Sequence, residues 1–241
     1  MSPKHISAKP FTAVLLPGLH GTAGLFHQMK QHKPARYTTL EINYPKGVIH
    51  SYEELTAMAK QQLLTIKGDF ILVGESFSGP IAIMLGAQKL PSLKGVVLAA
   101  SFIEAPRSKI WRYLPGRMMF YIGNSMIKIT EKMMGRPDGM LKRMAMAIDG
   151  VKASVLTGRI QSVFSVDVKD KLKQMNAPLL YLRAERDLAV PSHNAKMIKA
   201  HKPSVQIIDI PANHLLLQTH AQEAWAAIQS FMNAPAQSQS T

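Results

Sequence analysis

Six short apolar runs along the chain have the length of buried β-strands. The first of them ends at Pro17-Gly18, and the third ends at Gly74. The expected strands cover residues 12–17, 37–42, 70–73, 96–100, 179–182 and 205–210. Helical patterns separate these runs, so we expect a mostly parallel sheet with right-handed crossovers and helices on both of its faces.

Apolar residues at helical spacing account for most of the segments between the expected strands. The clearest helix opens at Ser51, and Glu54 stands three residues later in the spacing of a capping box. Further helices are expected at residues 79–90, 192–201 and 218–232. The pattern as a whole predicts the α/β fold class.

Residues 102–175 interrupt this alternation, because no clear sheet strand falls within them. One helical stripe there begins with Met118, Tyr121, Ile122 and Met126. A shorter stripe at 141–148 predicts a second helix. We therefore expect a core formed by residues 1–101 and 176–233, a helical cap inserted at 102–175, and a frayed polar tail at 234–241.

Composition narrows the class of protein. Of the 241 residues, 46% are hydrophobic and 18% are charged, which excludes a disordered or fibrous chain. The chain has no cysteine, which excludes disulfide frameworks and cysteine nucleophiles and fits a reducing compartment. No run approaches the roughly 18 apolar residues that a membrane helix needs. The expectation is a soluble cytoplasmic protein.

The net charge of +14 points to an acidic partner or to a solvated basic face. Residues 102–175 carry 14 basic and 6 acidic side chains, so the expected cap holds more than half of the excess. It also holds nine of the 15 methionines. A field of this sign attracts nucleic acid, anionic lipid, an acidic protein or an acidic substrate.

The run from Gly74 to Gly79 reads Gly-Glu-Ser-Phe-Ser-Gly and joins an expected buried strand directly to an expected helix. This is the setting of a nucleophile elbow, a sharp turn that strains the backbone of a serine and requires small neighbours. Ser76 is the serine with a glycine two positions before it. Its hydroxyl would project from the edge of the sheet at a helix N-terminus, which favours developing negative charge.

With this motif the chain resembles the α/β-hydrolase family, and the resemblance covers nearly its whole length. The family's elbow is Gly-x-Ser-x-Gly, and here Ser78 stands at the fifth position. In the family, the serine is followed along the chain by an acid and then a histidine, each after a later strand. The resemblance implies Ser76 as the nucleophile, Asp187 as the acid and His214 as the base. Glu185 is the alternative acid.

The resemblance also implies an oxyanion hole, which stabilises the charge that acyl transfer places on a carbonyl oxygen. Residues 14–22 match the family's strand followed by His-Gly-x, with Pro17 where histidine is common. By that alignment the backbone N–H of Leu19 is one donor, and the N–H of Phe77 is the other. An alignment shifted by three residues makes Thr22 the donor, but Pro17 ends the strand, which favours Leu19.

A serine carboxylic-ester hydrolase that forms an acyl-enzyme, without metal or cofactor, is the activity that the resemblance implies. In the family the cap sets specificity, and the methionine-rich stripe either packs the core or lines a pocket for a flexible acyl chain. Some capped members remove the methyl ester from pimeloyl-acyl carrier protein in biotin synthesis and dock the acidic carrier on a basic cap. The candidate docking residues here are Arg136, Lys142, Arg143 and Arg159.

Two alternatives remain. One is a general carboxylesterase or thioesterase without a protein partner, since the same triad cleaves both types of bond. The other is a non-catalytic binding protein that uses the basic cap on an anionic membrane or, less favoured, on nucleic acid. The complete set of Ser76, Asp187 and His214 argues against this second alternative. No metal site is expected, because the histidines lack clustered carboxylates at ligand spacing.

Overall fold

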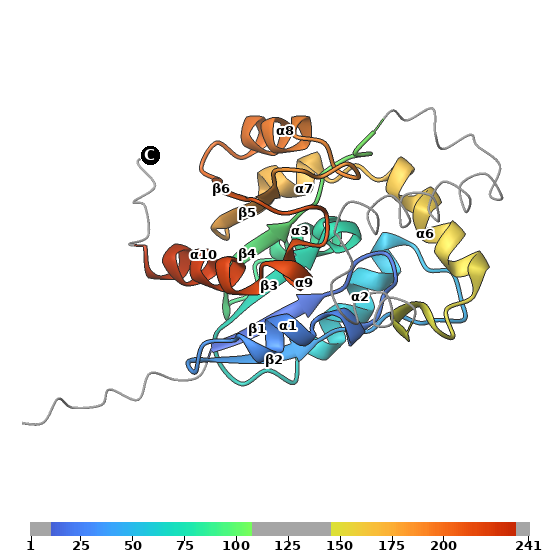
Figure 1. The fold of residues 1–241 in the computed structure, drawn as a ribbon, viewed down its shortest axis with the longest axis horizontal. Helices are drawn as coiled ribbons and strands as arrows, with labels where there is room; N and C mark the ends of the chain where they lie inside the picture. The colour runs from blue at the N-terminus through green and yellow to red at the C-terminus, as the bar shows by residue number, and fades with distance from the viewer. Residues whose placement is uncertain (1–10, 108–145, 235–241) are drawn as a thin grey trace, which may run out of the picture.

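Six parallel strands form one sheet in the computed structural model, which describes residues 11–107 and 146–234. The order across the sheet is β2-β1-β3-β4-β5-β6, and every neighbouring pair is parallel (Figure 1). The strands are β1 (Phe11–Leu16), β2 (Tyr37–Glu41), β3 (Phe70–Glu75), β4 (Leu93–Ala99), β5 (Leu179–Ala184) and β6 (Gln206–Ile210). All six expected strands are confirmed, with ends that differ by at most three residues.

The strand order changes direction at β1, because β2 lies on one side of it and β3 on the other. Chains that leave the carboxyl ends of two such strands diverge and leave a crevice between their loops. Leu16 at the end of β1 pairs with Gly74 near the end of β3, so these two loops start side by side. The fold thus places the expected oxyanion loop next to the expected elbow.

Helices cover both faces of the sheet, as expected. One face packs against α2 (Tyr52–Leu63), α3 (Gly79–Gly86), α7 (Lys169–Gln174) and α8 (His193–His201). The other face packs against α1 (His27–Gln31), α9 (Leu216–Thr219) and α10 (Ala221–Asn233). Residues 13–16 of β1 alternate between the two clusters and are fully buried, which explains why this part of the strand is a continuous apolar run.

The capping box at the start of α2 is confirmed, whereas two helix ends differ from the prediction. Ser51 Oγ accepts the N–H of Glu54 at 3.2 Å, and Glu54 Oε2 accepts the N–H of Ser51 at 2.7 Å. The helix expected at 79–90 ends at Gly86, because Lys89 has a positive φ of 52° that a helix does not allow. The helix expected at 218–232 is two helices, α9 and α10, separated by the non-helical His220.

The segment between β4 and β5 is anchored where it leaves and rejoins the sheet. Glu104 and Asp167 form an isolated antiparallel bridge, and the N–H of Val168 donates to the carbonyl of Ile103 at 2.8 Å. Lys169 Nζ lies 2.9 Å from Glu104 Oε2 and 3.0 Å from Asp167 Oδ2. These contacts hold the two ends of the segment together.

The described part of this segment contains α6 (Ala153–Ser165), which lies on the opposite side of the molecule from α10 (Figure 1). Of the helix expected at 141–148, residues 146–148 are helical and the rest falls outside the described residues. The same is true of the predicted pocket residues Met118, Tyr121, Ile122 and Met126. The cap boundary at residue 175 stays a prediction. None of the helices in the two described ranges is long and apolar enough to cross a membrane.

Candidate active site

The turn after β3 has the geometry of a nucleophile elbow. A 3-10 turn of three residues begins at Ser76 and leads directly into α3 at Gly79. Ser76 has a φ of +47°, in the left-handed region that a residue with a side chain rarely adopts. A Cβ on Gly74 would lie 2.7 Å from the Ser78 carbonyl oxygen, and a Cβ on Gly79 would lie 1.8 Å from Ser101 Oγ. The Ser78 carbonyl within the turn and Ser101 after β4 therefore require glycine at these two positions.

Ser78 occupies the position of the second glycine in the family's motif. It is fully buried, and its Oγ donates to the Pro17 carbonyl and accepts the Tyr44 hydroxyl at 2.6 Å. Burial raises the pKa of the Tyr44 hydroxyl, so this group stays protonated and can donate. Ser78 thus ties the elbow to the loop after β1, a link that a glycine could not make.

Ser76, His214 and Asp187 form a continuous hydrogen-bonded chain. His214 Nε2 lies 2.8 Å from Ser76 Oγ, and His214 Nδ1 lies 2.7 Å from Asp187 Oδ2. The other carboxylate oxygen of Asp187 accepts the N–H groups of Ala189 at 2.8 Å and Val190 at 2.9 Å. A carboxylate only accepts, so His214 Nδ1 carries the hydrogen and Nε2 accepts the serine proton. The structure brings the three predicted residues together in the order that this proton transfer requires.

Two neighbouring strands deliver the acid and the base of this chain. Asp187 follows β5 and His214 follows β6, and the two strands pair up to Ala184 and Ile210. Their loops therefore begin side by side at the carboxyl edge of the sheet. Glu185, the alternative acid, is exposed, whereas the Asp187 side chain is 3% exposed. The geometry selects Asp187.

A second buried carboxyl group, that of Glu75, lies beside the histidine. Glu75 is 3% exposed, and Gln218 Nε2 donates to its Oε1 at 2.7 Å. Burial raises the pKa of Glu75, although the Gln218 hydrogen bond and the charge of His214 act in the opposite direction. For His214, burial acts to lower the pKa, but Asp187 and Glu75 outweigh it and raise the pKa above 6.5. His214 is therefore a stronger base than a free imidazole.

The loop after β1 presents the N–H of Leu19, which makes no hydrogen bond to any other described residue. The N–H of Thr22, the alternative donor, is already used, because it donates to His20 Nδ1 at 3.2 Å. The N–H of Phe77 directly follows the strained Ser76, and the Phe77 side chain anchors it in the core at 1% exposure. The structure favours Leu19 over Thr22 as the partner of Phe77.

Arg159 does not lie on a docking surface, contrary to the sequence-based prediction. It is only 2% exposed, and its guanidinium donates to the carbonyls of Leu19 and Pro45, each at 2.9 Å. A guanidinium enclosed in this way cannot meet a carrier protein. The remaining candidates for that role, Arg136, Lys142 and Arg143, lie outside the described residues.

Sequence reasoning missed three residues that support the site, namely Tyr44, Glu75 and Gln218. Glu75 directly precedes Ser76, and Gln218 follows His214 by four residues, so their spacing could have identified them. No local signal marks Tyr44, which reaches Ser78 from 34 positions away. In the two described ranges, no group of three or more histidines and carboxylates could hold a metal ion.

Comparisons with solved structures show the same fold in proteins of different activities. A lipase-esterase related protein from Clostridium acetobutylicum ATCC 824 is 15% identical, with 92% of this chain and 95% of that chain covered and a TM-score of 0.76. The enol-lactonase from Burkholderia xenovorans LB400 is 16% identical, with 95% and 93% covered and a TM-score of 0.78. A bromoperoxidase from Bacillus anthracis is 16% identical, with 93% and 92% covered and a TM-score of 0.75. At these identities the likeness shows the fold alone.

Sequence comparison adds the family. No curated protein matches the chain in sequence. Residues 13–228, which include the elbow and the loops that carry Asp187 and His214, match the sequence model described as the alpha/beta hydrolase family. This match spans most of the 241 residues. The chain therefore belongs to the alpha/beta hydrolase family and is a hydrolase.

Proposed function

We propose that this protein is a serine carboxylic-ester hydrolase that forms an acyl-enzyme on Ser76. One observation carries the proposal: a strained serine with its Oγ 2.8 Å from a histidine, which is itself 2.7 Å from a buried carboxylate. A serine hydroxyl is a weak nucleophile until a base takes its proton, and this chain of hydrogen bonds supplies the base. The lipase-esterase related and enol-lactonase structures with the same fold support ester chemistry.

Acylation uses every part of the site. Ser76 Oγ attacks the ester carbonyl carbon while its proton passes to His214 Nε2, and Asp187 stabilises the imidazolium. The carbonyl oxygen becomes an oxyanion, which accepts hydrogen bonds from the N–H groups of Leu19 and Phe77. When the tetrahedral intermediate collapses, the C–O bond to the alcohol breaks and the alcohol leaves with the proton from His214.

Deacylation repeats these steps with water. A water molecule attacks the acyl carbon of the acyl-enzyme, and His214 Nε2 takes one of its protons. The second tetrahedral intermediate uses the same two N–H donors. Its collapse breaks the bond to Ser76 Oγ, which regains the proton from His214, and the carboxylic acid leaves. The enzyme returns to its starting state without a cofactor.

The first test is hydrolysis of p-nitrophenyl esters with acyl chains from about C2 to C12, by the wild type and by Ser76→Ala. We expect the mutant to lose on the order of 10⁴-fold or more in kcat/KM. A serine-directed fluorophosphonate should label the wild type and not the mutant. Undiminished hydrolysis by Ser76→Ala would show that another residue is the nucleophile.

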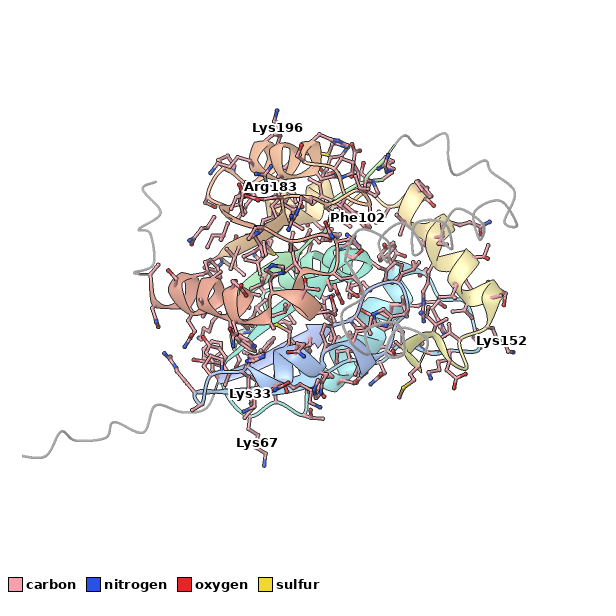
Figure 2. The ribbon with its side chains drawn as sticks, in the orientation of Figure 1. Lys33, Lys67, Phe102, Lys152, Arg183 and Lys196 are labelled. Atoms are coloured by element: carbon pink, nitrogen blue, oxygen red, sulfur yellow. The ribbon has the colours of Figure 1, made fainter. Side chains whose placement is uncertain are left out.

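For the substrate, we propose an acyl methyl ester carried by an acidic acyl carrier protein, of the pimeloyl type used in biotin synthesis. The basic excess of residues 102–175 supports this proposal. Basic residues outside this segment do not all share one face, since Lys67 and Lys196 point outward on opposite sides of the molecule (Figure 2).

The carrier proposal is tested with Arg136→Glu and Arg143→Glu combined in one variant. We expect activity on a carrier-bound methyl ester to fall roughly tenfold or more, and activity on p-nitrophenyl butyrate to stay within about twofold. An equal loss of activity on both substrates would contradict the proposal that the cap docks a carrier protein. A general carboxylesterase or thioesterase would instead hydrolyse small esters or thioesters as well as carrier-bound ones.

A further inference from the structure

Arg159 is a buried arginine that reaches from α6 to the loop after β1. Among the described residues, its guanidinium donates to two backbone carbonyl oxygens, Nη1 to Leu19 and Nη2 to Pro45, each at 2.9 Å. Its Cζ also lies 5.7 Å from the centre of the Tyr44 ring, in a cation–π contact. Burial of a guanidinium costs free energy that burial of an apolar side chain does not. Its presence here therefore calls for a role beyond filling space.

Leu19 is held through the peptide groups on both of its sides. The Gly18 carbonyl, which shares a planar peptide group with the Leu19 N–H, accepts the N–H of Gly21 at 2.9 Å. The next peptide group carries the Leu19 carbonyl, and Arg159 Nη1 donates to that oxygen. With both groups fixed, the direction of the Leu19 N–H is fixed as well.

The surroundings of the guanidinium are fitted to it. Gly21 has a φ of +73°, and a Cβ on it would lie 2.3 Å from Arg159 Nη1. The Gly21 carbonyl accepts the N–H of Tyr44 at 2.8 Å, and the Tyr44 hydroxyl bonds to Ser78 of the elbow. Arg159 and Tyr44 therefore join α6, the loop after β1 and the elbow in one packed unit.

We propose that Arg159 is a positioning residue for the oxyanion hole. Its guanidinium holds the loop so that the Leu19 N–H faces the carbonyl oxygen of the ester that Ser76 attacks. This inference rests on the proposed ester hydrolysis and adds α6 to the elements that set its rate. Negative charge develops on that oxygen only as the tetrahedral intermediate forms. A displaced donor therefore reduces the stabilisation of the transition state more than that of the bound substrate. Loss of Arg159 should therefore lower kcat and leave KM nearly unchanged.

The test compares Arg159→Met and Arg159→Lys with the wild type on p-nitrophenyl butyrate. Methionine fills much of the same space without a donor, whereas lysine keeps one charged donor that cannot reach both carbonyls. Arg36→Met is the matched control. Arg36 also makes a cation–π contact, 5.9 Å from the Phe11 ring. It is exposed, however, and it directly precedes β2, so it lies at the amino ends of the strands, whereas the site lies at their carboxyl ends.

We expect Arg159→Met to lower kcat by roughly 10- to 100-fold, with KM within about threefold of the wild type. A trifluoromethyl ketone, which forms a tetrahedral oxyanion adduct with Ser76, should lose affinity by the same factor as kcat. The matching secondary alcohol, which forms no oxyanion, should bind unchanged. Arg159→Lys should recover part of the loss, and Arg36→Met should stay within about twofold of the wild type on every measure.

Circular dichroism and thermal unfolding show whether each variant is folded. If Arg159→Met does not fold, the kinetics of Arg159→Lys test the positioning role instead. A kcat of folded Arg159→Met within about threefold of the wild type overturns the positioning role, and so does a kcat of Arg159→Lys equal to that of the wild type where the methionine variant does not fold. Equal losses of affinity for the ketone and the alcohol overturn it as well. Wild-type protein that neither hydrolyses an ester nor reacts with a fluorophosphonate overturns the proposed function, and this inference with it. An active wild type with unaffected variants overturns this inference alone.

Discussion

The elbow and the loop after β1 meet at one active site, but different parts of the chain hold them in place. The elbow is held at shorter sequence distances: Gly74 is crowded by the carbonyl of Ser78, four residues later, and the Ser76 carbonyl accepts the Ser101 hydroxyl, 25 positions away, at 2.6 Å. The loop depends on distant partners, because the Pro17 carbonyl is held from 61 positions away and the Leu19 carbonyl from 140 positions away. The elbow motif and the neighbouring strand end therefore determine most of the geometry of Ser76, whereas distant parts of the assembled fold determine that of the proposed oxyanion donor.

This difference predicts two classes of mutational effect. A change in the triad removes a step of proton transfer that no other group can supply, so activity should nearly vanish. A change in an anchor of the loop leaves the nucleophile intact and displaces one of two donors, so activity should fall by a smaller factor. The variants below test this comparison, from the largest expected effect to the smallest.

Asp187→Asn should cause the largest loss. The asparagine amide donates to His214 Nδ1, which moves the imidazole hydrogen to Nε2, and Nε2 can then no longer accept the proton of Ser76. We expect kcat/KM to fall by on the order of 10⁴-fold with little change in stability. Steady-state hydrolysis of p-nitrophenyl butyrate measures this effect. Glu185→Gln, at an exposed carboxylate, is the control. A comparable loss of kcat/KM in this variant would mean that the wrong carboxylate has been assigned.

The parts of the fold that could be predicted from the sequence are those with a local cause. The inner strands β1, β3, β4 and β5 are largely apolar runs buried on both faces, and the capping box at Ser51 is specified by residues three apart. The end of α3 could not be predicted, because the residues after Gly86 remain compatible with a helix. The break at His220 likewise falls inside an uninterrupted helical pattern.

The same rule applies to the site. Ser76, Asp187 and His214 could be proposed because they match the positions at which the family carries its nucleophile, acid and base, each after a strand of one parallel sheet whose carboxyl ends share an edge. Arg159 was assigned to the surface because its charge was considered without its neighbours. Its buried environment is created by the loop after β1 and by Tyr44, which lie more than 100 positions away in the sequence. Sequence spacing does not encode such a contact.

Ser78→Ala should have an intermediate effect, because it cuts the link between elbow and loop without touching the triad. The Pro17 carbonyl and the Tyr44 hydroxyl each lose a buried partner, which should cost about 1–3 kcal/mol of unfolding free energy. We expect kcat to fall roughly tenfold, since the loop that carries the Leu19 donor loses one of its anchors. Urea unfolding and steady-state kinetics on the same preparation measure both effects.

Tyr44→Phe is the comparison for this variant. It removes the donor to Ser78 but leaves the bond from Ser78 to the Pro17 carbonyl, so stability should fall while most of kcat is retained. If Tyr44→Phe lowers kcat as much as Ser78→Ala does, the bond to Pro17 is not what positions the loop. In that case the Tyr44 hydroxyl, through its hydrogen bond to Ser78, holds the loop.

Glu75→Gln should have the smallest effect, a shift in the pH dependence of activity. His214 must be neutral to accept a proton, so kcat/KM falls as the pH drops through its raised pKa. Glu75 is one of the groups that raise this pKa, and the glutamine keeps an oxygen for the Gln218 amide without the charge. The His214 pKa should therefore fall, and the acidic limb of the kcat/KM profile should move to lower pH.

An unmoved limb would mean that burial keeps Glu75 protonated in the working enzyme, because a neutral acid does not favour the imidazolium. Asp187 would then be the carboxylate that raises the pKa of the base.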